Sequence, residues 1–171
     1  MNETLCPGCG LRMPLTNKPY DGYFNASPEC WSVFTEVAGA EFSNVVLFSQ
    51  AHQLTVDAYA TQHAGGPHPD KSIAVHLSGL HLFYEEGVKP TSIAPLLQKL
   101  ATRTNQWPHF DPPEVRGSMT IFDVALAESH IDAVRAWSRG VWESWSPHHA
   151  AIAELVRNSS VNIDVNRDFR K

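Results

Sequence analysis

Cys6-Pro7-Gly8-Cys9-Gly10 is the stretch of sequence that decides how the first part of this chain folds. A Cys-x-x-Cys turn supplies two sulfurs from one tight loop, and glycines let the backbone fold closely around a bound ion. The only other cysteine is Cys30, and the 171 residues include nine histidines. Three thiolates and one imidazole complete a tetrahedron, so the sequence predicts a Cys3His site for Zn²⁺.

A redox-active pair is the main alternative for a Cys-x-x-Cys motif. Such a pair needs its first cysteine at the start of a helix, because the helix lowers the pKa of the thiol. Here Gly10, Pro14 and Pro19 follow the motif, so no helix is expected. The sequence therefore favours a metal knuckle formed by Cys6 and Cys9 over a redox pair or inert thiols.

The composition indicates a globular protein with a sizeable core. Hydrophobic residues make up 43% of the chain, and its length suits one domain. A net charge of −5 and the lack of a basic patch argue against nucleic-acid binding. No apolar run approaches the roughly 20 residues of a membrane span, and the N-terminus lacks an apolar signal region. We expect a cytoplasmic protein that binds neither nucleic acid nor membrane, and whose unidentified partner is a small ligand or another protein.

Helical periodicity begins after a segment rich in proline and glycine. Ser27-Pro28-Glu29 is typical of a helix start, with serine as N-cap and proline in the first turn. The apolar spacing predicts helices over 28–42, 50–63, 71–86, 92–103, 124–144 and 147–157, a crossing loop over 104–118 and an extended piece over 118–123.

This pattern predicts an all-α fold, a helical bundle of about five helices with an irregular, zinc-stapled N-terminal arm. We expect a single domain over residues 1–171. It consists of the arm (1–27), the bundle (28–157) and a polar tail (158–171).

The fourth zinc ligand is expected on the second helix, which runs antiparallel to the first. Twelve residues after Cys30 the first helix has risen about 18 Å, and the second must return over that distance. If the second helix starts near Gln50, His63 comes level with Cys30, whereas a much earlier start brings His52 level. We favour His63, with His52 as the second candidate, and the alternative for either is a hydrogen-bonded core histidine.

Further polar residues fall on adjacent predicted helices. The candidates for the fourth ligand or for a second site are His52, Asp57, Tyr59 and His76. Facing helices can assemble a His/carboxylate metal site whose open position activates water. No His-Glu-x-x-His spacing is present, however, and hydrogen bonds within the core account for the same residues.

Two other groups of residues favour structural roles. Trp137, Trp142 and Trp145 could line a ligand pocket, but large core residues on an amphipathic helix are the simpler interpretation. Three further histidines have no partner evident in the sequence, and we expect surface or loop positions for them. They are His68, His109 and His130.

The motifs together resemble a known family. They run through most of the chain, and are Cys6-Pro7-Gly8-Cys9-Gly10, Cys30-Trp31, the stretch 52–59, Gln62-His63, His76, and the stretch 136–149. This pattern is similar to an uncharacterised bacterial family, domain of unknown function 5946. Its most specific part is the string Val-Asp-Ala-Tyr-x-x-Gln-His over 56–63. One departure is Ala64-Gly65 in place of Pro-Gly, which bears on where the second helix ends.

The family name implies no activity, but the resemblance groups Asp57, Tyr59 and His63 as a unit. Within it, Asp57 or Tyr59 would orient a ligating histidine.

Two functions fit the sequence. In the first, zinc serves folding and the bundle is a binding module. In the second, the protein is a metal-dependent enzyme, a hydrolase or a thiol-transfer enzyme, with a His/Asp site between helices. Whether the chain is an enzyme stays open. The first function is favoured because the knuckle accounts for three ligands and no catalytic signature is present.

Overall fold

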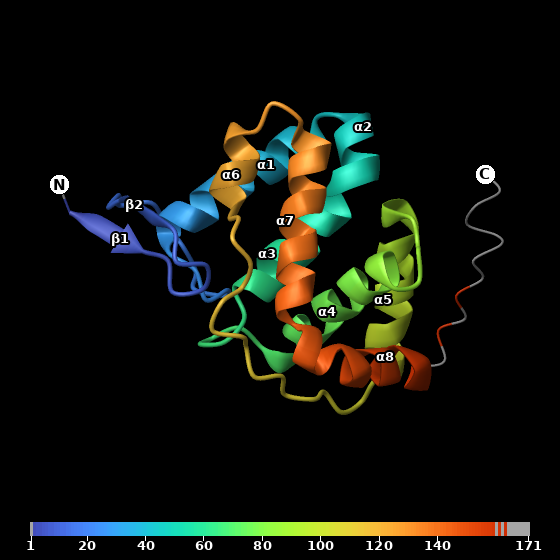
Figure 1. Ribbon diagram of the computed structural model, residues 1–171. Coiled ribbons are helices and arrows are strands. Elements are labelled where there is room, and N and C mark those ends of the chain that lie inside the picture. Colours follow the sequence, from blue (N-terminus) through green and yellow to red (C-terminus); the bar gives the residue numbers. More distant parts are fainter. Residues whose placement is uncertain (1, 160, 162, 164–171) are drawn as a thin grey trace.

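The computed structural model describes residues 2–159, 161 and 163 of the chain. These residues form a helical bundle with a two-stranded sheet at one edge (Figure 1), so the predicted all-α fold is confirmed. The helices are α1 (Pro28–Phe42), α2 (Val45–Leu47), α3 (Gln53–Gln62), α4 (Asp70–Tyr84), α5 (Pro90–Arg103), α6 (Ile121–Leu126), α7 (His130–Ser144) and α8 (His149–Asn158). A π-helical segment, Phe48–His52, joins α2 to α3, and a 3-10 turn, Ser146–His148, joins α7 to α8.

The N-terminal arm is more regular than predicted. Strands β1 (Glu3–Leu5) and β2 (Arg12–Pro14) pair in antiparallel register. Between them, the Cys6 N–H donates to the Leu11 carbonyl at 2.8 Å, and the Gly10 N–H donates to the Cys6 carbonyl at 2.9 Å. Gly10 has a φ of 76°, which favours glycine. The Cys-x-x-Cys motif is therefore the tip of a β-hairpin, whose three-residue strands are too short to show an alternating pattern.

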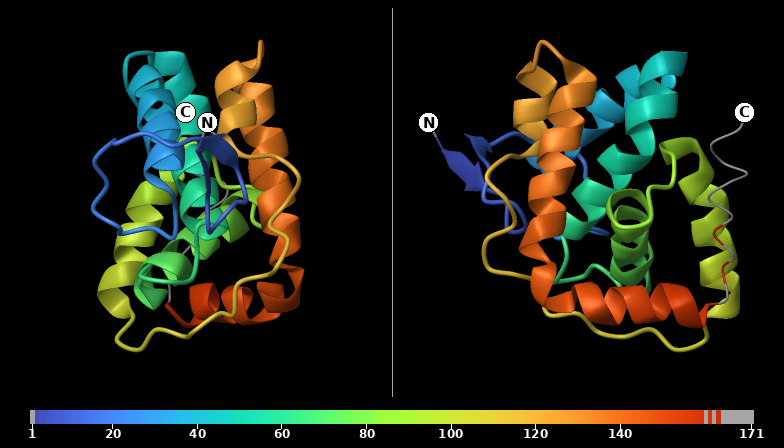
Figure 2. Two further views of the ribbon diagram at one scale, coloured as in Figure 1. Left: turned by 90° about the vertical axis from the view of Figure 1, so that its left-hand side faces the viewer. Right: turned by 45° about the vertical axis from the view of Figure 1, so that its right-hand side comes forward.

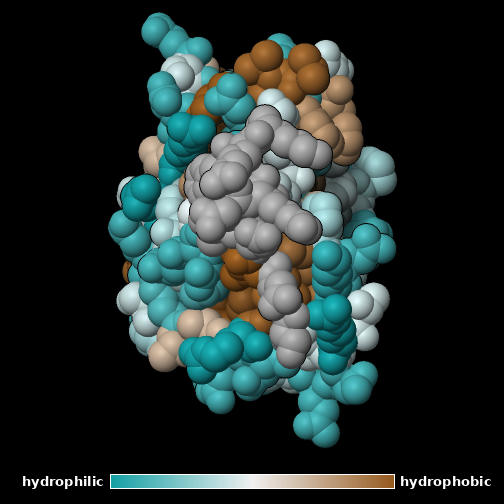
Figure 3. All heavy atoms as spheres, turned by 90° about the vertical axis from the view of Figure 1, so that its right-hand side faces the viewer, coloured by the Kyte–Doolittle hydropathy of each residue, from teal (hydrophilic) through white to brown (hydrophobic). Residues whose placement is uncertain are grey.

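The second helix begins five residues earlier than Gln50. The Asn44 side chain accepts from the N–H groups of Val46 and Leu47, which caps α2. The early start was missed because Val45, Val46 and Phe48 are exposed and give residues 45–50 no buried apolar face. With Phe42 they form a hydrophobic surface where α1 meets α2, visible in Figure 3.

Contacts at two points fix the register of α1 against this second helix. Cys30 Sγ lies 3.3 Å from His63 Nε2, and Glu41 Oε2 lies 2.8 Å from His52 Nδ1. Glu41 is eleven residues after Cys30 and His52 is eleven before His63, so both pairs fit one antiparallel register. The expectation that an early helix start would bring His52 level with Cys30 is wrong. In both pairs the midpoint of the intervening chain lies between residues 46 and 47, which belong to α2. Helix α2 is therefore part of the turn that reverses the direction of the chain.

Residues 118–144 also differ from prediction. In place of an extended piece and one long helix, α6 ends at Leu126 and α7 starts anew at His130. Thr120 caps α6, since its hydroxyl accepts from the Phe122 N–H at 3.3 Å and its own N–H donates to Asp123 Oδ2 at 2.6 Å. The sequence predicted one helix because no glycine or proline separates the apolar positions of α6 from those of α7.

The core forms where α4 packs against α3, α5, α7 and α8. Helix α8 crosses one end of the bundle (Figure 2). Trp137, Trp142 and Trp145 are buried in this core, which agrees with their structural interpretation. No helix in the part of the chain that the structure describes has both the length and the apolar character needed to cross a bilayer.

Gly79 of α4 makes room for the buried Asp57 of α3. A Cβ at Gly79 would lie 2.2 Å from Asp57 Oδ2. We expect Gly79→Ala to destabilise the protein by about 2 kcal/mol in urea unfolding, because overpacking outweighs the better helix propensity of alanine. The matched control is Gly39→Ala in α1, where nothing lies within 4 Å, and it should be neutral or stabilising. Equal behaviour of the two variants would contradict this explanation.

Candidate metal centre

The four predicted zinc ligands meet at one point. Cys6 and Cys9 come from the hairpin tip, Cys30 from the first turn of α1, and His63 from the residue after α3. One ligand atom from each lies within 4.8 Å of the others, with 3.8 Å between Sγ of Cys9 and Sγ of Cys30. A tetrahedral zinc ion has sulfurs about 3.8 Å apart and sulfur–nitrogen distances of about 3.6 Å. The four residues therefore form a group that could hold a metal ion.

The first turn of α1 ties this group to the arm. As predicted, Ser27 caps the helix, and its hydroxyl accepts from the Cys30 N–H at 3.2 Å. The Ser27 N–H lies 3.5 Å from Cys6 Sγ. Further along the arm, the N–H and hydroxyl of Thr16 donate to one oxygen of the buried Glu29, at 2.7 and 3.1 Å. These bonds hold the hairpin against the helix and bring its sulfurs to Cys30.

The orientation of His63 is set by the preceding turn of α3. His63 Nδ1 lies 2.7 Å from the Tyr59 carbonyl, which can only accept, so Nδ1 carries the proton. The lone pair of Nε2 is then left for a metal ion. The Tyr59 ring stacks on His63 with centroids 4.0 Å apart, and its hydroxyl donates to Cys30 Sγ at 3.6 Å. Tyr59 thus contacts two members of the group, His63 and Cys30.

Electrostatics also favour a cation at this point. Hydrogen bonds from Cys30 and Cys9 lower the pKa of the Cys6 thiol, whereas hydrogen bonds with Cys6 and Cys9 raise the pKa of Cys30. The sulfurs compete for negative charge, so they cannot all ionise together without compensation. A divalent cation supplies that compensation, because it binds thiolates and releases their protons.

The group is closed to solvent. Cys6, Cys30 and His63 are at most 1% exposed, and only Cys9 is half-buried. Gly8 lies directly over the imidazole, since a Cβ there would be 2.6 Å from His63 Cδ2 and 2.5 Å from the Asn25 carbonyl oxygen. Of the two glycines in the motif, only Gly10 has a positive φ. Gly8 is needed for close approach, and the site offers little space for an added ligand.

Of the four candidates for a second site, Asp57 and His76 contact each other, whereas His52 and Tyr59 have other partners. Asp57 Oδ1 lies 2.7 Å from His76 Nδ1 and accepts from Gln53 Nε2 at 2.9 Å, whereas His52 pairs with Glu41 elsewhere. Burial raises the pKa of Asp57, and the hydrogen bond from His76 opposes that rise. Groups of three or more His, Cys, Asp or Glu side chains that lie close together could hold a metal ion. Within residues 2–159, 161 and 163 there is one such group, formed by Cys6, Cys9, Cys30 and His63.

A buried cluster around Glu41 was missed by sequence reasoning. Glu41 is fully buried, and it accepts from Thr55 Oγ1 at 2.5 Å, with His52 Nδ1 and His130 Nε2 each 2.8 Å away. A glutamate in the last turn of a helix is normally exposed, so nothing in the sequence pointed to it. Glu41 connects the end of α1 to the second helix and to the start of α7.

The three histidines expected at surface or loop positions have partners that the sequence did not indicate. His130 Nε2 lies 2.8 Å from Glu41 Oε1, and this contact was not evident because the two residues are 89 positions apart in sequence. His68 is buried and lies 2.8 Å from the Ser72 hydroxyl. His109 is exposed as expected, but it pairs with Asp70 at 2.8 Å, and this contact raises its pKa.

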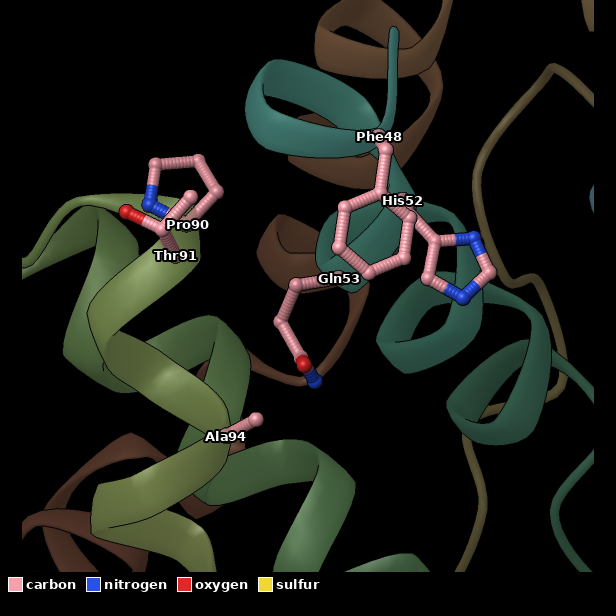
Figure 4. Close-up of a pocket in the computed structure, with 6 residues that line it drawn as sticks. All are labelled: Phe48, His52, Gln53, Pro90, Thr91 and Ala94. Carbon is pink, nitrogen blue, oxygen red and sulfur yellow. The ribbon is translucent and has the colours of Figure 1, made fainter. Parts of the chain in front are cut away.

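Two hollows lie beside these clusters. The smaller has a volume of about 80 Å³ and is lined by Phe48, His52 and Gln53 and by Pro90, Thr91 and Ala94 of α5 (Figure 4). The larger has a volume of about 390 Å³, and Ser72, His76 and Ala101 are among the residues that line it. The larger hollow is within the size range of small-molecule sites.

These features define a helical-bundle protein with a closed Cys3His centre at the root of an N-terminal hairpin. A model of a family of unknown function, DUF5946, matches residues 4–146. The match covers most of the chain, so the chain belongs to this family, as its motifs indicated. No curated protein and no solved structure matches it.

The string over 56–63 that carried the family resemblance has several structural roles. Tyr59 and His63 serve the Cys3His group, whereas Asp57 orients His76, which is not one of the four ligands. Gln62 accepts from Trp137 Nε1 at 3.0 Å and donates to the carbonyls of Arg116 and Met119 at 2.8 Å. One helical segment therefore connects the metal centre, the core and the crossing loop.

Proposed function

We propose that this protein is a zinc-stabilised binding module, in which Zn²⁺ held by Cys6, Cys9, Cys30 and His63 serves folding. The observation that carries this proposal is the closure of the site: four donors surround one point, and three of them are at most 1% exposed. Structural zinc sites have four protein ligands, whereas catalytic sites keep a position open for water or substrate.

Zinc is the metal that suits this donor set best. Thiolate and imidazole donors at tetrahedral spacing favour zinc over magnesium or calcium, which prefer oxygen ligands. The three thiols have no disulfide partners, as expected in a reducing compartment, so a cytoplasmic location is part of the proposal.

The larger hollow supports the binding role of the bundle. Its volume of about 390 Å³ and its mixture of apolar and polar side chains suit a small ligand. The alternative, a metal-dependent enzyme with a His/Asp site, has less support. His52 and Tyr59 have other partners, and among the residues that the structure describes, no third histidine, cysteine or carboxylate joins the Asp57–His76 pair to form a group that could hold an ion.

Hydrogen exchange with and without a chelator tests the structural role of the metal. Removing the metal should expose the amides of residues 2–26 to exchange, while those in α4 and α7 stay protected, because only the hairpin depends on the cluster. The same chelator on His109→Ala, which alters an exposed histidine, should give the wild-type pattern. Unchanged protection of the hairpin after complete metal removal would contradict a structural role.

A further inference from the structure

The start of α4 carries a hydrogen-bonded chain that the zinc centre does not use. The Ser72 hydroxyl lies 2.8 Å from His68 Nε2, and His68 Nδ1 lies 3.2 Å from the His63 carbonyl oxygen. A carbonyl only accepts, so Nδ1 carries the proton and Nε2 presents its lone pair. The Ser72 hydroxyl must therefore donate to Nε2.

This chain has the parts of an activated serine. A nucleophilic serine needs an imidazole that takes its proton and an acceptor that holds the imidazole in the right tautomer. His68 is 4% exposed, and the Phe24 and Tyr23 rings pack against it with centroids 4.8 and 5.5 Å away. The imidazole is thus fixed by packing as well as by its hydrogen bonds, whereas Ser72 is only half-buried.

A second imidazole lies one helical turn further along the same face. His76 Nδ1 lies 2.7 Å from Oδ1 of the buried Asp57, so Nδ1 donates its proton to that carboxylate. The lone pair of Nε2 is then left to accept a proton. Ser72, His76 and Lys71 all line the hollow of about 390 Å³, together with the apolar Val75 and Ala101. A nucleophile, a second acid–base group and a cation therefore share one wall with apolar surface beside them.

We propose that this hollow is a hydrolytic site for small carboxylic esters, with Ser72 as nucleophile and His68 as its base. Ser72 Oγ forms a bond to the acyl carbon, its proton passes to His68 Nε2, and the ester C–O bond breaks. The leaving oxygen takes that proton and departs as the alcohol. Lys71, whose Nζ lies 5.6 Å from the centroid of the Trp107 ring, is the cation on this wall that stabilises the oxyanion, and Val75 and Ala101 favour a short acyl chain.

Water completes the cycle. A water molecule gives one proton to His76 Nε2 and attacks the acyl carbon, and the bond to Ser72 Oγ breaks. The carboxylic acid leaves, and the proton on His76 returns to Ser72. One ester and one water give one acid and one alcohol, and no oxidant or further cofactor is needed.

A fluorophosphonate reagent and p-nitrophenyl acetate test this site on the metal-loaded full chain. We expect mass spectrometry to place one fluorophosphonate per chain on Ser72. Ser72→Ala should abolish the label and lower ester hydrolysis at least tenfold. The control is Ser144→Ala, whose hydroxyl is half-buried but bonded to the Val141 carbonyl, and it should behave as wild type.

His76→Asn separates the two steps. It should keep a burst of about one p-nitrophenolate per chain and slow the steady state at least tenfold, which a merely structural role would not produce. An unlabelled Ser72 in folded wild type overturns the proposal, whether or not Ser72→Ala folds. Ester hydrolysis that is equal in wild type and folded Ser72→Ala also overturns it. Neither result bears on the zinc centre, whose metal content is measured separately.

Discussion

Replacing Cys30 by serine is expected to release the bound metal and lower the melting temperature by roughly 10 °C. Cys30 is fully buried and its sulfur contacts Cys9, His63 and Tyr59, so it is the central member of the Cys3His group. Structural zinc contributes about 10–16 kcal/mol to the folding of small zinc peptides. A loss of only about 4 kcal/mol here lowers the melting temperature by roughly 8–16 °C, at about 2–4 °C per kcal/mol. Thermal unfolding followed by circular dichroism measures the effect.

Two histidine variants provide the matched comparison. His63→Ala removes the fourth ligand and should fall in melting temperature almost as far as Cys30→Ser. His109→Ala removes an exposed histidine whose side chain is 62% accessible, and should stay within about 1 °C of wild type because surface ion pairs contribute little. If His63→Ala and His109→Ala have the same melting temperature, the Cys3His centre is not what stabilises the hairpin.

Replacing Glu41 by leucine should destabilise the protein by about 3–5 kcal/mol in urea unfolding. The change leaves the Thr55 hydroxyl and the paired nitrogens of His52 and His130 without their acceptor in a buried setting. Glu41→Gln should lower the free energy of unfolding by less, because the amide of glutamine retains one oxygen acceptor. The loss should appear as a lower urea midpoint with an unchanged slope.

Glu36→Leu on the same helix is the control for this prediction. Its side chain is 74% exposed and its ion pair with Lys18 spans 3.7 Å, so the expected change is within about 0.5 kcal/mol. A loss for Glu41→Leu as small as that of Glu36→Leu would show that the Glu41 cluster does not hold α1, the second helix and α7 together.

The grouping of Cys6, Cys9, Cys30 and His63 could be predicted because its constraints lie in the sequence. Zinc chemistry limits the donor types, and the Cys-x-x-Cys spacing fixes two of them. The antiparallel return of the second helix led to His63, although the helix start at Gln50 was wrong. His63 still lies level with Cys30 because α2 is part of the turn between α1 and α3. The earlier helix start therefore did not change how α3 is aligned along α1.

The partners of the other polar residues could not be predicted from local pattern. His130 and Glu41 are far apart in sequence, and their contact depends on how α7 packs against the end of α1. The pairing of Asp57 with His76 likewise requires that α3 and α4 meet at Gly79. Helical periodicity indicates which face is buried, but it does not determine which polar groups on two buried faces come into contact.

The zinc content of the purified protein tests the central claim most directly. Elemental analysis combined with thiol titration should find one zinc per wild-type chain and no reactive thiol until the protein is denatured. Cys30→Ser should retain well under a tenth of that zinc. A folded wild-type chain without metal, in which all three thiols of Cys6, Cys9 and Cys30 react freely, would contradict the account.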